Sequence, residues 1–112
     1  MYDVVVRHGL VVDGTGSPGK HLDVGIKDGK IVAVATRITD QGCQEIDATG
    51  LVVAPGFIDT HSHSDLMLLA NPSLEEKTRQ GVTTEILGQD GLGLAPIPSS
   101  EAADMLTEHL AG

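Results

Sequence analysis

The stretch Pro-Gly-Phe-Ile-Asp-Thr-His-Ser-His, residues 55–63, carries the strongest structural signal in this chain. It places two histidines, His61 and His63, one residue apart at the end of an apolar run. Side chains alternate between the two faces of an extended segment, so both imidazoles project from one face together with Phe57 and Asp59. Their backbones then lie roughly 6–7 Å apart, and imidazoles that lean together can place nitrogens about 2 Å from one divalent ion. The pattern favours a metal site, although core histidines and cupin-type oxygenase sites share the same letters.

The segment that follows residue 55 is typical of a βαβ unit. Residues 57–61 read as a buried strand, and residues 82–87 read as a second strand rich in β-branched side chains. Between them Ser73 and Glu76 match a capping box, which predicts a helix that Gly81 would end. The connection of about 20 residues is long enough to join parallel strands. A last helix is predicted near the end of the chain, with its apolar stripe at Ala102, Leu106 and Leu110.

The first half of the chain predicts short strands joined by turns, in the manner of an antiparallel meander. Apolar or alternating runs recur at residues 4–6, 10–12, 24–26, 31–34, 45–47 and 51–53. The Asp28-Gly29 pair suits a two-residue type I′ hairpin between two of these runs. The change of character near residue 55 indicates two regions, residues 1–54 and residues 55–112.

The run at residues 55–63 resembles the start of the amidohydrolase superfamily, where it forms the first strand of a (β/α)8 barrel. Residues 81–96, Gly-Val-Thr-Thr-Glu-Ile-Leu-Gly-Gln-Asp-Gly-Leu-Gly-Leu-Ala-Pro, are similar to the D-aminoacylase (N-acyl-D-amino-acid deacylase) branch. The resemblance implies a mixed β and α/β fold. Residues 1–54 would be N-terminal strands of a small β-sandwich domain, and residues 55–112 the first βαβ unit of a truncated barrel. A complete barrel needs about 250 residues, so these 112 residues are expected to be a piece of a longer protein.

The resemblance also implies a site. Active sites of such barrels lie at the carboxyl ends of the strands, so His61, His63 and Asp90 are expected to meet there as metal ligands. Asp90 stands where the D-aminoacylase branch carries a metal-binding cysteine, and its carboxylate is a harder donor than a thiolate. Asp59 and Asp65 are candidates for supporting a ligand or contacting substrate. Asp90 also fits a simple turn, and Asp65 a helix cap or loop. The expected cofactor is a divalent metal, with zinc favoured.

The function implied is hydrolysis of the amide bond of an N-acyl-D-amino acid or a related small-molecule amide. The metal would lower the pKa of bound water toward about 7 and polarise the scissile carbonyl, while a carboxylate outside this chain moves the proton. The 112 residues alone are expected to be inactive.

Three other functions fit parts of the pattern. A cyclic amide hydrolase of the dihydroorotase or hydantoinase type shares the His-x-His start. A non-catalytic, stand-alone β module is compatible with the first half. A two-His-one-carboxylate iron protein is disfavoured, because Met67 stands where an acidic residue would follow His63.

Composition limits the partners. A net charge of −9 and an isoelectric point near 4.7 argue against nucleic acid and anionic membrane surfaces. No apolar run reaches the ~18 residues of a membrane span and no signal peptide is recognisable, so a cytoplasmic location is expected. The unpaired edges of the strands at 57–58 and 82–87 predict that the isolated chain self-associates through them, swaps segments between copies, or leaves the region after His63 poorly ordered. The charged residues of the predicted helix are expected to form a solvated face: Glu75, Glu76, Lys77 and Arg79.

Overall fold

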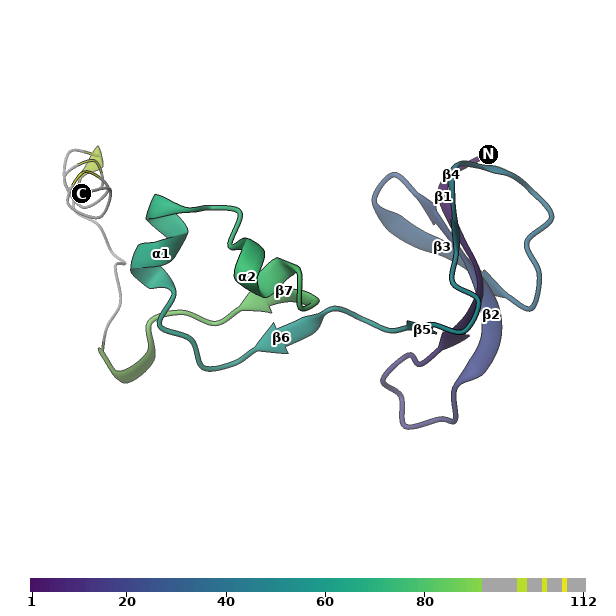
Figure 1. Cartoon of the computed structure of the whole chain (residues 1–112), viewed down its shortest axis with the longest axis horizontal. Coiled ribbons are helices and arrows are strands. Elements are labelled where there is room, and N and C mark those ends of the chain that lie inside the picture. Colours follow the sequence, from purple (N-terminus) through teal and green to yellow (C-terminus); the bar gives the residue numbers. More distant parts are fainter. Residues whose placement is uncertain (92–98, 101–103, 105–107, 109–112) are drawn as a thin grey trace. The chain divides into compact units, whose positions relative to one another are not determined.

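The computed structural model describes residues 1–91, 99–100, 104 and 108 (Figure 1). The chain divides into two units, Met1–Pro55 and Gly56–Gly112, called here the first and second unit. In the part of the chain that is described, no helix has the length and apolar character needed to span a membrane. The predicted last helix, with Ala102, Leu106 and Leu110, lies outside the described residues.

The first unit is a single five-stranded sheet. Its strands are β1 (Tyr2–Val11), β2 (Lys20–Lys27), β3 (Lys30–Ala35), β4 (Gly42–Asp47) and β5 (Val52–Val53). The order is β3-β2-β1-β4, and β5 also pairs with β1. Every residue of this unit is described, and together they form one sheet without a second layer. The sandwich therefore stays a prediction.

The predicted antiparallel meander is correct for β1, β2 and β3 and wrong for the rest. β4 and β5 both run parallel to β1. The separate runs expected at residues 4–6 and 10–12 belong to one strand, which shifts register between Val6 and Gly9. The hairpin between β2 and β3 is confirmed as a two-residue turn with positive φ at both positions, 50° at Asp28 and 70° at Gly29.

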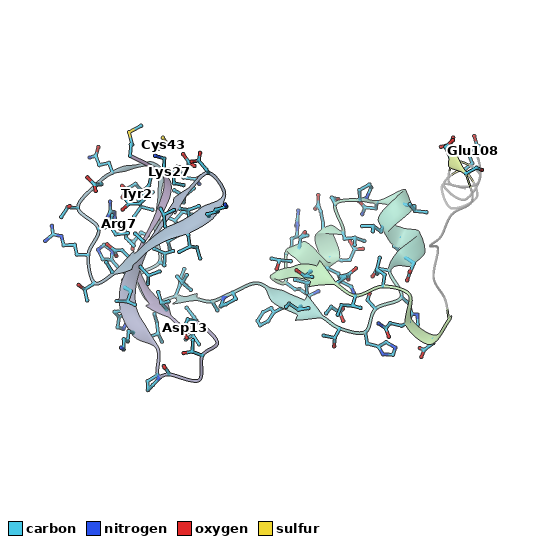
Figure 2. The ribbon with its side chains drawn as sticks, turned by 180° about the vertical axis from the view of Figure 1, so that it is seen from behind. Tyr2, Arg7, Asp13, Lys27, Cys43 and Glu108 are labelled. Carbon is cyan, nitrogen blue, oxygen red and sulfur yellow. The ribbon has the colours of Figure 1, made fainter. Side chains whose placement is uncertain are left out.

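Arg7 connects the sheet of the first unit to the loop between β3 and β4 (Figure 2). Its guanidinium donates to the backbone oxygens of Ile38 at 2.6 Å and Asp40 at 3.0 Å, and it pairs with the carboxylates of Asp23 and Glu45. Hydrogen bonds from Arg7 lower the pKa of Glu45 to about 2. The apolar core of this unit is small and consists of Val5, Val24, Ile38 and Ala48.

The second unit contains the predicted βαβ arrangement. β6 (Phe57–Asp59) and β7 (Val82–Glu85) are parallel, with Phe57 opposite Val82 and Asp59 opposite Glu85. Two short helices, α1 (Asp65–Ala70) and α2 (Glu75–Thr78), lie between them in the chain, and a 3-10 turn at Gln89–Gly91 follows β7. The continuation of this unit into a barrel stays a prediction.

Several local expectations in the second unit are wrong. β6 ends at Asp59 instead of residue 61, and it is not buried, since Phe57 is 65% exposed. The capping box is absent, because the N-cap of α2 is Leu74, in a left-handed conformation with φ 38°. The Ser73 hydroxyl bonds the Asn71 side chain instead, 2.7 Å away. Helix α1 was not expected at all.

Candidate metal centre

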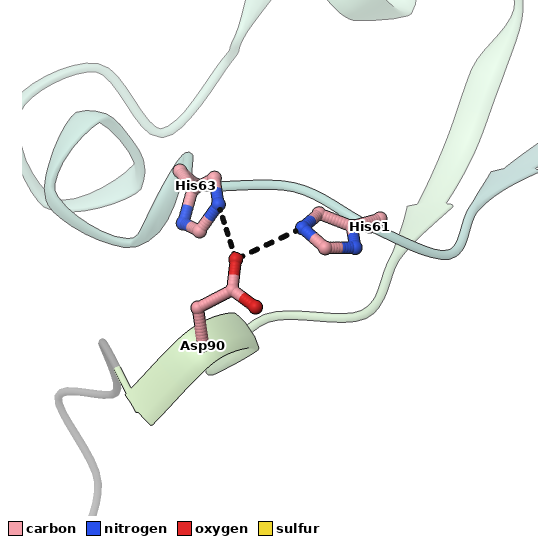
Figure 3. Close-up of side chains that lie close together, drawn as sticks. All are labelled: His61, His63 and Asp90. Carbon is pink, nitrogen blue, oxygen red and sulfur yellow. Dashed lines mark hydrogen bonds and ion pairs between the residues drawn. The ribbon is translucent and has the colours of Figure 1, made fainter.

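Three polar side chains converge in the second unit (Figure 3). Asp90 Oδ2 lies 3.2 Å from His61 Nε2 and 3.2 Å from His63 Nε2. The two imidazole rings meet edge to face, with centroids 5.3 Å apart and planes at 71°. One ligand atom from each of the three side chains lies within 4.8 Å of the others. The structure therefore brings together the three residues that the sequence marked as metal ligands.

The parallel pairing of β6 and β7 explains this convergence. His61 and His63 lie in the loop that leads from β6 to α1, and Asp90 lies in the 3-10 turn after β7. Because Asp59 pairs with Glu85 at the ends of the two strands, both loops leave the sheet at the same edge. The parallel pairing thus places the loop that carries the imidazoles beside the turn that carries the carboxylate.

The turn that carries Asp90 is fixed by contacts on either side of the histidines. Asp90 has φ 55° and ψ 28°, a left-handed conformation that aspartate tolerates better than most residues. The backbone N–H of Gly88 donates to Asp65 Oδ1 at 3.1 Å, and Gln89 Nε2 donates to the Thr60 carbonyl at 3.3 Å. These bonds attach the turn to Thr60, immediately before the His-x-His segment, and to Asp65, two residues after it.

The three side chains fit a divalent ion by chemistry and by spacing. Two imidazole nitrogens and a carboxylate oxygen are donors that zinc accepts, and in a tetrahedral site with bonds of about 2.1 Å they would lie about 3.4 Å apart. The spacings from Asp90 Oδ2 to the two imidazole nitrogens, both 3.2 Å, are close to that value, and all three ligand atoms lie within 4.8 Å of one another. The side chains of His61, His63 and Asp90 are 61%, 47% and 64% exposed, which leaves space for further ligands, water or substrate.

A second polar cluster lies beside the histidine loop and is centred on Lys77. Lys77 Nζ is 2.8 Å from Asp59 Oδ2 and 2.5 Å from Glu85 Oε1, and it donates to Ser62 Oγ at 2.8 Å. Hydrogen bonds to Asp59 and Glu85 raise the pKa of Lys77, and the bond from Lys77 lowers the pKa of Asp59. The cluster, called here the Lys77 network, consists of Asp59, Ser62, Ser64, Lys77 and Glu85.

The two other candidate aspartates support the loops. Asp59 Oδ1 accepts the backbone N–H of His61 at 3.2 Å, and its other oxygen faces Lys77. Asp65, which is 8% exposed, contacts Gly88 through Oδ1, while its buried Oδ2 has no protein partner among the described residues. Neither carboxylate bonds an imidazole nitrogen in the described contacts, and contact with substrate stays a prediction for both.

The sequence interpretation missed Lys77 and Glu85. Lys77 was assigned to a solvated helix face, yet its side chain is only 27% exposed and pairs with two carboxylates. The available signal was Glu85, because an acidic residue in a strand of β-branched residues needs a cationic partner when it is buried. Its side chain is 11% exposed.

Sequence similarity to known proteins extends over most of the chain. The sequence model of the amidohydrolase family matches residues 44–108, more than half of the chain. Over 96 residues the chain is 45% identical to N-acyl-D-glutamate deacylase of Alcaligenes xylosoxydans xylosoxydans, which covers 86% of this chain and 20% of that protein.

Structural similarity extends over the same region. The crystal structure of N-acyl-D-glutamate deacylase from Bordetella bronchiseptica, complexed with zinc and a phosphonate inhibitor, matches with a TM-score of 0.81 at 41% identity. That match covers 88% of this chain and 21% of the other.

Dihydroorotase of Streptococcus pneumoniae is 45% identical over only 60 residues, 54% of this chain and 14% of that protein. The chain thus spans about a fifth of the length of the deacylases that it matches.

Proposed function

Since this chain belongs to the amidohydrolase family, we propose that it is the N-terminal part of a metal-dependent hydrolase that cleaves the amide bond of N-acyl-D-amino acids. The observation that carries the proposal is the convergence of His61, His63 and Asp90 at the carboxyl ends of two parallel strands. Similarity supports the deacylase substrate class over the cyclic amides, because the deacylase match covers 86% of the chain and the dihydroorotase match 54%.

In this proposal the chain supplies ligands and the loops that position them. His61 and His63 would hold the ion through Nε2, and Asp90 would hold it through Oδ2. A divalent ion, zinc in our proposal, would supply Lewis acidity to activate water and polarise the scissile carbonyl. Asp65 and Gln89 keep the Asp90 turn next to the histidine loop through their hydrogen bonds to Gly88 and Thr60.

Substitution of the ligands in the full-length protein tests the proposal. His61→Ala and His63→Ala remove one nitrogen donor each, so both variants should lose bound zinc and at least about 100-fold of their turnover. His21→Ala is the matched control, because His21 is an exposed histidine of β2 in the first unit. Zinc content by atomic spectroscopy and hydrolysis of N-acetyl-D-amino acids are the two measurements.

Two outcomes would contradict different parts of the proposal. Unchanged zinc content and turnover in both histidine variants would exclude this metal site. Retention of zinc by the parent protein without hydrolysis of any N-acetyl-D-amino acid would exclude the substrate class. Turnover of dihydroorotate in that case would favour the cyclic amide hydrolases.

A further inference from the structure

The Lys77 network lies next to the histidine loop, and its members are not the proposed metal ligands. Lys77 comes from α2, Asp59 from the end of β6 and Glu85 from the end of β7. Its other two members, Ser62 and Ser64, belong to the loop that carries His61 and His63. The network therefore joins three separate elements to the ligand-bearing loop.

The ammonium group of Lys77 is saturated by this arrangement. A lysine ammonium has three protons to donate, and Nζ has three acceptors: Asp59 Oδ2, Ser62 Oγ and Glu85 Oε1, at 2.8, 2.8 and 2.5 Å. The Ser62 hydroxyl lies a further 2.7 Å from the Ser64 hydroxyl. Lys77 thus bonds directly to one loop serine and, through it, reaches the second.

Alternate side chains of the histidine loop point to opposite sides, one buried and one exposed. Ser62 is 4% exposed and Ser64 9%, whereas the side chains of His61 and His63 are 61% and 47% exposed. The buried serines contact Lys77 and Glu85, while the imidazoles face Asp90. Ser62 is bonded directly to His61 and His63, and Ser64 to His63, so a shift of either serine would also shift a histidine.

Because it is partly buried, this network should contribute more to the stability of the loop than a surface ion pair would. Exposed pairs contribute little to stability, but Glu85 is 11% exposed and Lys77 27%. Without Lys77 the Glu85 carboxylate would lack its only cationic partner among the described residues, and Ser62 Oγ would lose its charged donor while it keeps the Ser64 backbone N–H. The loop would then have to rearrange or admit water.

We propose that Lys77 is a positioning residue for the metal centre, acting through Ser62 and Asp59 to fix the loop that carries His61 and His63. This inference rests on the proposed metal site. Lys77 holds Ser62 through its hydroxyl, and it holds the Asp59 carboxylate, which in turn accepts the His61 backbone N–H. Partners that orient metal ligands typically change metal affinity about 10–100-fold when removed.

The test measures zinc release from the full-length, zinc-loaded protein to an excess of chelator. Lys77→Met keeps most of the side-chain length and removes the charge, and it should speed release about tenfold or more. Ser62→Ala removes the hydroxyl and should also speed release. Because Lys77 acts through Ser62, the double variant should release zinc little faster than Lys77→Met alone.

Two controls separate positioning from general destabilisation. Arg79→Met removes a cation from the end of the same helix, where Arg79 is 79% exposed and pairs with Glu75. It should leave release unchanged. Gly81→Ala strains a position with φ 85° and should lower the melting temperature of the metal-free protein. It too should leave zinc release from the folded protein unchanged.

Defined results would overturn the inference. Zinc release from Lys77→Met at the parent rate would overturn it. So would a double variant in which the fold-increase in release rate equals the product of the fold-increases in the two single variants. Should Lys77→Met fail to fold, an unchanged rate in Ser62→Ala would overturn it equally. His61→Ala identifies a failure of the metal site itself, since parent-like zinc release by that variant rejects the site, whereas lack of amidase activity rejects only the proposed substrate.

Discussion

Asp90 distinguishes this sequence from the branch it resembles, since a carboxylate occupies the position expected for a thiolate. If Asp90 is a ligand, Asp90→Cys should still bind metal, whereas Asp90→Ala should bind zinc at least about tenfold more weakly. Sulfur is the softer donor, so the cysteine variant should also prefer zinc over manganese more strongly than the parent does. Competition titrations with both metals measure these affinities. Zinc affinity in Asp90→Ala equal to that of the parent would show that the residue only shapes the turn.

At this scale the sequence predicted the candidate ligands and the supporting aspartates Asp59 and Asp65, but not the contact between Lys77 and Glu85. His61 and His63 are recognisable because their spacing is local, and Asp90 because it follows the next strand of the same unit. Lys77 and Glu85 could not be paired in the same way. Their contact depends on where α2 lies relative to the ends of β6 and β7, which no local pattern specifies.

The strands were predicted more reliably than their pairing. Apolar or alternating runs located the strands of the first unit, and the Asp28-Gly29 pair located the turn, because these features depend on neighbouring residues. The parallel pairing of β4 and β5 with β1 depends on tertiary packing instead. Helix α1 was missed because no side chain caps its start. The capping box failed because the chain enters α2 through Leu74, whose backbone is left-handed.

The Arg7 contacts predict an acid-sensitive sheet in the first unit. Glu45 has its pKa lowered from 4.5 to about 2 by Arg7, so the folded state favours the ionised carboxylate. The stability from this pair is present above pH ~4.5 and is lost as the pH falls from there toward about 2. Tyr2 is the only tyrosine and there is no tryptophan, so its fluorescence reports unfolding of this unit.

Substitution of Glu45 should remove part of that acid sensitivity. Glu45→Gln lacks the titrating carboxylate, so its urea midpoint should be lower than that of the parent at pH 7 and should change less between pH 5 and about 2.5. Glu76→Gln, on α2 of the second unit, is the control and should follow the parent. Parallel pH profiles for Glu45→Gln and the parent would refute a contribution from this pair.

At the scale of the whole molecule, the described residues leave much apolar surface exposed. On β6, Phe57 is 65% and Ile58 61% exposed, and Ile86 beyond β7 is 48% exposed. The β6–β7 sheet has only two strands in the described residues, so each strand has one unpaired edge. Unpaired apolar edges associate with other strands. The deacylases that the chain matches are about five times as long as the chain. Uncovered apolar strands are what a short segment of such a protein would leave.

The isolated 112-residue chain is therefore predicted to self-associate through the β6–β7 sheet. Its sedimentation coefficient should rise with concentration, because strand edges and the exposed apolar side chains would pair between copies. Ile58→Lys places a charge on the exposed surface of β6 and should shift the equilibrium toward monomer. Met67→Lys adds the same charge on α1, where Met67 is 50% exposed, and should have little effect. A compact monomer at every concentration, or equal responses of the two lysine variants, would refute association through these strands.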